Sequence, residues 1–281
     1  MKIVQMPIPF VKMSGTGNDF ILIDHRKPRL AREMMPEFAR LVCRRRFSVG
    51  ADGLIFIEPS EAADFQWAFF NADGSEAEMC GNGARCAARF AYMHGIAPAH
   101  MRFETIAGII EANVADVNVS ILMTEPKDFR LNRTVRLQDR TVALHSVDTG
   151  VPHAVVFVED YDGFDLTETG RAIRFHADFM PAGTNVNFVR PLKEGGLQVR
   201  TYERGVENET LACGTGAAAA ALIAAVLGHA ASPVDIVTSG GGRLSISFDL
   251  HQGKAAANVF LKGPAHIIYT GELSEDALHE D

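Results

Sequence analysis

The duplicated stretch of this sequence is Cys80-Gly81-Asn82-Gly83-Ala84, which recurs as Cys213-Gly214-Thr215-Gly216-Ala217. Each copy has a cysteine, two glycines at matching offsets and then an alanine-rich run without a helix breaker. Each copy predicts a thiol at the first turn of a helix, where backbone N–H groups lack intrahelical partners. The positive end of the helix dipole can lower a cysteine pKa below its free value of about 8.5.

The whole second half of the chain repeats the first half in one register. Five pairs of special residues are each separated by 133 positions, namely Gly17 and Gly150, Gly50 and Gly183, Cys80 and Cys213, Gly81 and Gly214, and Gly83 and Gly216. A threonine precedes the first glycine of both halves, and a short apolar strand follows the second glycine in both. This register predicts two copies of one structural unit.

The fold class expected from this pattern is α+β, with two pseudo-symmetric domains that arose by internal duplication. Residues 217–227 are apolar on every face, which is typical of a helix buried all round. Because the remaining pattern is rich in short strands, we expect a curled, mostly antiparallel sheet around a central helix in each domain, with an active site in the cleft between the domains.

The expected domain boundaries follow from the same pattern. Residues 1–127 plus 265–281 form the N-terminal domain, and residues 128–264 form the C-terminal domain. The polar stretch 125–140 is interpreted as the crossing between them. The apolar residues 267–269 are left over after the second copy, so they are expected to return to the first sheet.

Composition excludes several classes of function. The chain has 281 residues, 47% of them hydrophobic and 22% charged, as in globular proteins. Its net charge of −8 argues against non-specific nucleic-acid binding. The four cysteines show no C-x-x-C or zinc spacing, the N-terminus has no signal-peptide pattern, and no apolar run is long enough to span a membrane. We expect a cytoplasmic protein that binds neither nucleic acid nor membrane.

Two equivalent thiols facing one site suit the inversion of a carbon centre. One thiolate removes a proton from one face of the carbon, and the other thiol donates a proton to the opposite face. Because the two groups interact, their protonation belongs to the pair. The free N–H groups at the two helix starts suit a substrate carboxylate, which would stabilise the carbanion.

Five motifs of the chain, in order, resemble diaminopimelate epimerases, members of the PLP-independent amino-acid epimerase and racemase family. The motifs are SGTGNDF, NADGSEAEMCGNGARC, DTGVPHAV, TNVNF and ERGVENETLACGTGA, and they extend from residue 14 to about residue 220. The resemblance implies a homodimeric isomerase, free of cofactor and metal, that interconverts LL- and meso-2,6-diaminopimelate in lysine and peptidoglycan precursor biosynthesis. It implies the same two-domain fold as the repeat.

The resemblance also implies roles for individual residues. Cys80 and Cys213 would be the catalytic acid–base pair. His153 and Glu203 would line the site and assist ionisation or bind the amino group. The substrate-binding residues implied are Asn18, Asn71, Gly81, Asn82, Asn185, Glu203, Arg204, Gly214 and Thr215, with Arg204 taking the distal carboxylate as a fork.

Three departures from the family pattern bear on the substrate. Val151 stands where many members have an asparagine before Pro-His, and Gly53 stands where some have a glutamine. One residue is added between Glu203 and Cys213. These departures leave open a second hypothesis, a related racemase or epimerase of another amino acid.

The same residues also admit structural interpretations and functions outside the epimerase class. Cys43 and Cys86 are interpreted as small buried apolar side chains, which is the usual role of an isolated cysteine. Taken alone, His153 is interpreted as a satisfied histidine at a strand start. Arg204 could be an ordinary surface cation, but its place between Glu203 and Gly205, just before the Cys213 motif, favours the site. A thiol-redox protein with a disulfide between Cys80 and Cys213, and a binding module for anionic amino acids, are the alternatives outside the epimerase class.

Overall fold

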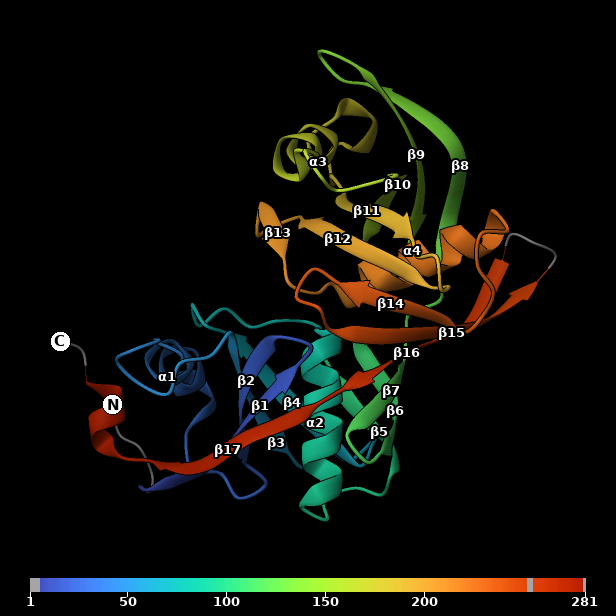
Figure 1. The fold of residues 1–281 in the computed structure, drawn as a ribbon. Helices are drawn as coiled ribbons and strands as arrows, with labels where there is room; N and C mark the ends of the chain where they lie inside the picture. The colour runs from blue at the N-terminus through green and yellow to red at the C-terminus, as the bar shows by residue number, and fades with distance from the viewer. Residues whose placement is uncertain (1–5, 252–254, 280–281) are drawn as a thin grey trace. The chain divides into compact units, whose positions relative to one another are not determined.

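The computed structural model describes residues 6–251 and 255–279. The chain divides into two compact units, of which unit 1 comprises residues 1–121 and 263–281 and unit 2 comprises residues 122–262. The divisions expected from the sequence lay after residues 127 and 264. Figure 1 shows the elements of both units.

Unit 1 is built on an eight-stranded mixed sheet. Its hydrogen-bonded neighbours run β17, β1, β2, β3, β4, β5, β6, β7, and only the pairs β2/β3 and β4/β5 are parallel. The bounds are β17 (His266–Leu273), β1 (Ile8–Gly15), β2 (Asn18–Asp24), β3 (Gly53–Glu58), β4 (Phe65–Asn71), β5 (His100–Thr105), β6 (Gly108–Ala115) and β7 (Asn118–Leu122). The last strand of the chain therefore pairs with the first, as expected for residues 267–269.

Unit 2 repeats this order of strands. Its neighbours run β8, β9, β10, β11, β12, β14, β15, β16, with the parallel pairs β10/β11 and β12/β14 at the same two places as in unit 1. The short strand β13 also pairs with β12. The bounds are β8 (Lys127–Arg136), β9 (Thr141–Asp148), β10 (Pro152–Phe157), β11 (Asn185–Pro191), β12 (Leu197–Glu203), β13 (Asn208–Thr210), β14 (Val234–Thr238), β15 (Arg243–His251) and β16 (Ala255–Pro264). The matching topology confirms the duplicated α+β fold.

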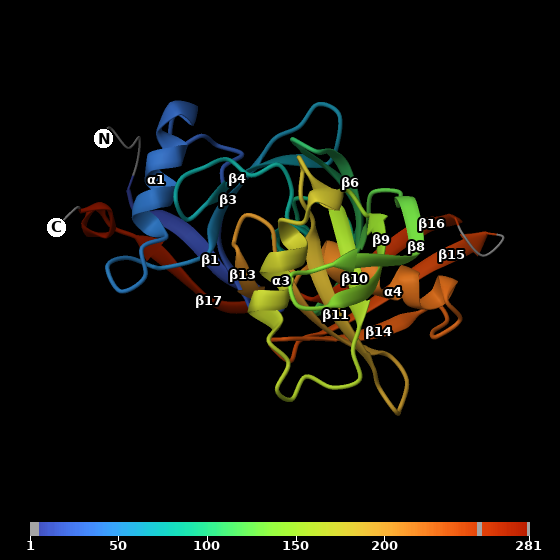
Figure 2. The same cartoon turned by 90° about the horizontal axis from the view of Figure 1, so that it is seen from above.

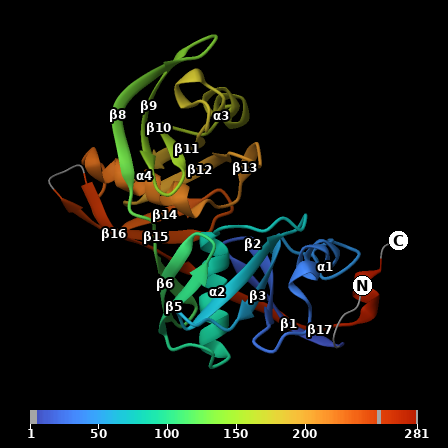
Figure 3. The ribbon, with the colours of Figure 1, turned by 180° about the vertical axis from the view of Figure 1, so that it is seen from behind.

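Each sheet curls around one central helix. The central helices are α2 (Gly81–Met93) and α4 (Gly214–Val226), whose first residues are 133 positions apart. Helix α2 contacts β1, β2, β3 and β6, and Figure 3 shows it running among the strands of unit 1. Helix α4 contacts β9, β10, β11, β12, β14 and β15, and residues 217–224 of α4 are at most 1% exposed. A helix can be buried this completely because it presents no polar side chain to the sheet.

A second helix packs on the other face of each sheet. Helix α1 (Met35–Val42) buries Phe38 and Val42 in one cluster with Phe56 in unit 1, and helix α3 (Leu166–Arg174) buries Ile173 in one cluster with Phe188 in unit 2. Figure 2 shows the course of both helices. The short 3₁₀ helices are η1 (Arg32–Met34), η2 (Ala177–Phe179) and η3 (Glu275–Leu278). Each sheet thus lies between two apolar layers, which fixes the strands that end near the central helix.

The expected crossing at residues 125–140 is mostly strand β8, which is a correction to the sequence analysis. Only Val135 and Leu137 are buried among residues 128–140. The β8–β9 pairing is interrupted twice, and Asp128 and Asn132 have φ values of 56° and 53°. These irregularities break the alternation of apolar and polar residues by which a strand is recognised.

We predict that Leu222→Ala lowers the free energy of unfolding by about 2–5 kcal/mol, because Leu222 is 0% exposed within α4 and its removal leaves a cavity. The measurement is urea unfolding followed by circular dichroism. Leu250→Ala is the matched control, since Leu250 is 38% exposed, and it should change stability by less than about 0.5 kcal/mol. Equal effects of the two substitutions would contradict a tightly packed α4.

Candidate active site

Cys80 is the N-cap residue of helix α2. Its backbone is extended, with φ −147° and ψ 118°, and the side chain is half-buried. The thiol donates to Oδ1 of Asn18 at 3.5 Å, and Nδ2 of Asn82 donates to the same oxygen at 3.3 Å. Unit 1 therefore brings Asn18, Cys80, Gly81 and Asn82 together at the positive end of a helix, where an anion or a thiolate is favoured.

A fully buried arginine lies one turn into the same helix. Arg85 is 0% exposed and donates to the carbonyl oxygen of Gly81, to Oδ1 of Asn82 and to the hydroxyl of Thr16. Burial lowers the pKa of Arg85, and the neighbouring thiols Cys86 and Cys80 act in the opposite direction. Arg85 is not among the site residues predicted from the sequence. The available signal was a pair of arginines, Arg85 and Arg89, within the otherwise mostly apolar run that follows the first cysteine motif.

Cys213 is the N-cap residue of helix α4 and has a different set of contacts. Its Sγ accepts the backbone N–H of Gly216 at 3.4 Å and lies 3.5 Å from the hydroxyl oxygen of Thr215. The carbonyl oxygen of Thr215 accepts the hydroxyl of Thr149 at 3.0 Å. Unit 2 thus groups Cys213, Gly214 and Thr215 at the start of its central helix, and the N–H donor favours negative charge on sulfur.

The buried side chain of Asn187 supports this helix start and was also missed from the sequence. Asn187 is 0% exposed, donates to His153 Nδ1 and to the carbonyl oxygen of Ala154, and accepts the Thr201 hydroxyl. A Cβ at Gly216 would lie well under 3.0 Å from Oδ1 of Asn187. Position 216 therefore requires glycine.

His153 is held neutral by its surroundings. It is 0% exposed, and burial, with a smaller contribution from the charge of Arg204, lowers its pKa to about 3. Because Nδ1 accepts from the Asn187 amide, the ring proton of a neutral imidazole is on Nε2, which has no hydrogen-bond partner among the described residues.

Asn185, Glu203 and Arg204 lie close together where β11 and β12 run side by side. Oδ1 of Asn185 accepts the backbone N–H of Arg204 at 2.8 Å, and Arg204 Nη1 donates to the carbonyl oxygen of Ala182. Glu203 accepts the hydroxyl of Thr210 at 2.8 Å, while burial raises the pKa of Glu203.

Asn71, by contrast, is exposed and donates to the hydroxyl of Ser75 at 3.0 Å in the loop after β4. Gly53 pairs with Asn71 across β3 and β4. A Cβ at Gly53 would meet the carbonyl oxygen of Phe70 at 2.8 Å, so the backbone here admits no glutamine.

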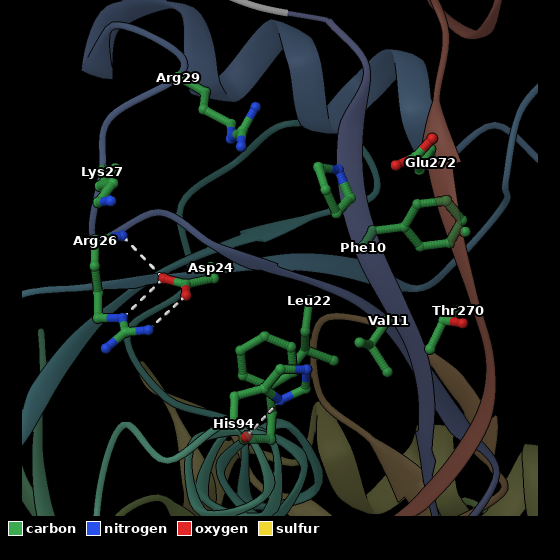
Figure 4. Close-up of a pocket in the computed structure, with 13 residues that line it drawn as sticks. Phe10, Val11, Leu22, Asp24, Arg26, Lys27, Arg29, His94, Thr270 and Glu272 are labelled. Carbon is green, nitrogen blue, oxygen red and sulfur yellow. Dashed lines mark hydrogen bonds and ion pairs between the residues drawn. The ribbon is translucent and has the colours of Figure 1, made fainter.

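A cavity of about 790 Å³ lies elsewhere in unit 1, by the C-terminal end of α2 (Figure 4). Its lining includes Leu22, Arg26, Phe90 and His94 and none of the predicted site residues. Arg26 is held by a bidentate ion pair with Asp24. Across residues 6–251 and 255–279, no three His, Cys, Asp or Glu side chains are grouped as metal ligands.

The family model for diaminopimelate epimerase matches residues 10–129 and 145–268. The chain belongs to the diaminopimelate epimerase family. It is 48% identical over 275 residues to the diaminopimelate epimerase of Hydrogenobaculum sp. (strain Y04AAS1), which covers 94% of this chain and 97% of that protein. The diaminopimelate epimerase of Aquifex aeolicus (strain VF5) is 45% identical, with 96% and 99% covered. Membership of this family makes the chain an isomerase.

Solved structures share the fold at low sequence identity. A phenazine biosynthesis protein of the PhzF family from Bacillus anthracis aligns with a TM-score of 0.74 and 16% identity over 96% of this chain and 100% of that chain. A hydroxyproline epimerase from Agrobacterium vitis aligns with a TM-score of 0.69 and 14% identity over 98% and 94%. In the described part of this family member, none of the helices has the length and apolarity needed to cross a membrane.

We predict that Gly216→Ala destabilises the protein by about 1–3 kcal/mol through overpacking against Asn187. Gly83→Ala, at the equivalent position of α2, is the matched control, because the nearest atom to its Cβ is Cδ1 of Ile55 at 3.3 Å. Gly83→Ala should be close to neutral, since alanine is also the better helix former. Thermal unfolding of both variants tests this, and equal losses would contradict the assigned role of Asn187.

We predict a pH dependence of stability caused by His153. The folded pKa of about 3 lies below the unfolded value of about 6.5, so only the unfolded state takes up a proton between these values. The free energy of unfolding should therefore fall as the pH drops below about 6.5, by up to about 1.4 kcal/mol per pH unit.

The measurement is urea unfolding at pH 7 and pH 5 of the wild type and of His153→Gln. Removing the titrating ring should reduce the loss of stability at pH 5. An unchanged loss in the variant would show that His153 titrates normally.

Proposed function

We propose that the chain interconverts LL- and meso-2,6-diaminopimelate by a cofactor-independent, two-base thiol mechanism. The observation that carries the proposal is that each unit has a cysteine as the N-cap residue of its buried central helix, at equivalent positions of the repeat. The names of the relatives supply the substrate. In this role the enzyme would act in the cytoplasm as a homodimer, in lysine and peptidoglycan precursor biosynthesis.

The proposed proton transfers balance without any other reactant. The thiolate of one cysteine takes the α-proton and becomes a thiol, while the thiol of the other gives its proton to the opposite face and becomes a thiolate. The stereocentre is inverted, and the reverse reaction exchanges the roles of Cys80 and Cys213. This scheme requires the two units to present their thiols to opposite faces of one α-carbon.

The two helix starts stabilise the carbanion in this scheme. Backbone N–H groups at residues 81–82 and 214–215 would bind the reacting α-carboxylate, into which the negative charge of the carbanion is delocalised. Such donors are most effective when they are already oriented, because no reorganisation is then needed during the reaction. Arg85 and Asn187, which fix the two helix starts, supply this rigidity.

The remaining polar groups would recognise the rest of the substrate. Arg204, Asn185 and Asn71 would hold the distal amino-acid end, and Glu203 with its raised pKa would accept a hydrogen bond from the α-amino group. His153 Nε2–H is a buried donor available to the substrate in this scheme. The valine at position 151 favours the alternative, a related racemase or epimerase with a different distal group, which a substrate comparison separates.

We predict that purified protein without added cofactor converts LL-diaminopimelate to the meso isomer and incorporates deuterium at the α-carbon in D₂O. Cys80→Ala and Cys213→Ala should each lose at least about 10²–10⁴-fold in kcat, since each removes one acid–base group. Cys43→Ala is the control, because Cys43 is buried and burial raises its pKa to about 12.

Product is measured by chiral chromatography and deuterium by mass spectrometry. Wild-type turnover in either active-site variant would refute the two-base scheme. Preferred turnover of proline, glutamate or histidine would favour the alternative substrate class.

A further inference from the structure

We propose that Asp52 is a positioning residue that fixes the orientation of the Asn18 carboxamide, so that its oxygen faces Cys80. The inference rests on the proposed acid–base role of Cys80. Asp52 lies in the segment before β3, and neither the motifs nor the family resemblance assigned it a role.

The hydrogen bonds of Asn18 determine which way its amide faces. Nδ2 of Asn18 donates to Oδ2 of Asp52 at 2.7 Å. An ionised carboxylate only accepts hydrogen bonds, so the amide nitrogen must face Asp52. The amide oxygen is thereby turned toward Cys80 at 3.5 Å and Asn82 at 3.3 Å. Without the Asp52 carboxylate, the longer contacts with Cys80 and Asn82 would be left to hold this amide, and a turn of the Asn18 amide would need Asn82 to move with it.

Asp52 is itself fixed by reciprocal bonds with Asp19. The backbone N–H of Asp19 donates to Oδ2 of Asp52 at 3.1 Å, and the backbone N–H of Asp52 donates to Oδ1 of Asp19 at 3.0 Å. Arg45 forms ion pairs with both carboxylates, at 2.6 Å to Asp19 and 2.9 Å to Asp52. The carboxylate of Asp52 therefore has little freedom to leave Asn18.

A buried lysine completes this charged network. Lys12 on β1 is 5% exposed, forms an ion pair with Asp19 at 2.8 Å and also donates to the carbonyl oxygen of Gly50. Hydrogen bonds and charges from Arg45 and Lys12 outweigh burial and lower the pKa of Asp19 to about 2. The network of Lys12, Asp19, Arg45 and Asp52 thus links the strands β1 and β2 to the segment that carries Asp52.

The orientation of the amide has a chemical consequence for Cys80. An acceptor oxygen stabilises the thiol, whereas an N–H donor would stabilise the thiolate. On its own helix Cys80 also has Arg85, whose charge favours the thiolate, and the thiol of Cys86. From β1, β2 and the adjoining segments come Lys12 and Arg45, which are positive, and Asp19 and Asp52, which are negative.

The pair formed by Asn18 and Asp52 is not repeated at the equivalent positions of unit 2. The positions 133 residues after Asn18 and Asp52 are Val151 and Asn185. The sulfur of Cys213 instead accepts the backbone N–H of Gly216. The hydrogen bonds described here thus include a side-chain acceptor at Cys80 and a backbone N–H donor at Cys213.

The test is the pH dependence of alkylation by iodoacetamide. Asp52→Asn is made in the Cys213→Ala background, so that Cys80 is the reacting thiol, because burial raises the pKa of Cys43 and of Cys86 to about 12. An asparagine at 52 can donate as well as accept, which frees the Asn18 amide to turn. We expect the midpoint for Cys80 to fall by about one pH unit, a tenfold faster reaction below the midpoint.

Two controls separate positioning from charge. Arg45→Gln changes the charge of the network by one unit in the opposite direction but keeps the hydrogen bond between Asp52 and Asn18. Its effect on the midpoint for Cys80 should therefore be small. Asp52→Asn in the Cys80→Ala background should leave the midpoint of Cys213 unchanged.

An unchanged Cys80 midpoint in Asp52→Asn overturns the inference. An opposite shift of equal size in Arg45→Gln also overturns it, because charge alone would then explain both variants. Alkylation is measured without substrate, so a positive result stands even if the epimerase assay fails, and a negative result leaves that assay intact. Circular dichroism verifies that each variant is folded.

Discussion

Burial of the middle of one helix inside each sheet is the constraint on which the rest of the structure depends. Helix α4 packs against β9 to β12, β14 and β15, and rotating or sliding it would expose alanine and leucine or force them into the sheet. The cap residue of such a helix has a fixed position. Cys213 therefore stays next to Thr215 and Gly216, and the same holds for Cys80 and the Gly81–Asn82 segment of α2.

The features visible in the sequence are those that cannot be built in another way. A thiol at a helix start with glycines around it recurs at 133 residues, and in unit 2 the glycine at position 216 leaves room for the side chain of Asn187. The apolar run at residues 217–227 predicts that helix α4 is buried. Strand β8 was not predicted because its irregular pairing and exposed polar residues leave no alternating pattern. Its pairing with β9, and not its composition, makes it a strand.

The supporting side chains were missed for a different reason. Arg85, Asn187 and Asp52 act through partners that are distant in the sequence, such as Thr16, His153 and Asn18. A sequence shows each of them as a single polar residue, and only the folded chain shows that Arg85 and Asn187 are fully buried. Burial turns an ordinary polar residue into a rigid one, because each buried donor or acceptor must keep its partner.

The two halves of the duplication have come to support their cysteines by different means. In unit 1 the supporting groups are charged: Arg85 in α2 donates to Asn82, and Asp52 accepts from Asn18. In unit 2 the supporting groups are neutral: Asn187 donates to His153, and burial keeps the His153 ring uncharged. A two-base reaction needs one thiolate and one thiol together, and identical surroundings would give the two groups equal intrinsic affinity for the single proton. Different surroundings give the two thiols unequal intrinsic affinities, so they favour one of the two protonation states from which the forward and the reverse reaction start.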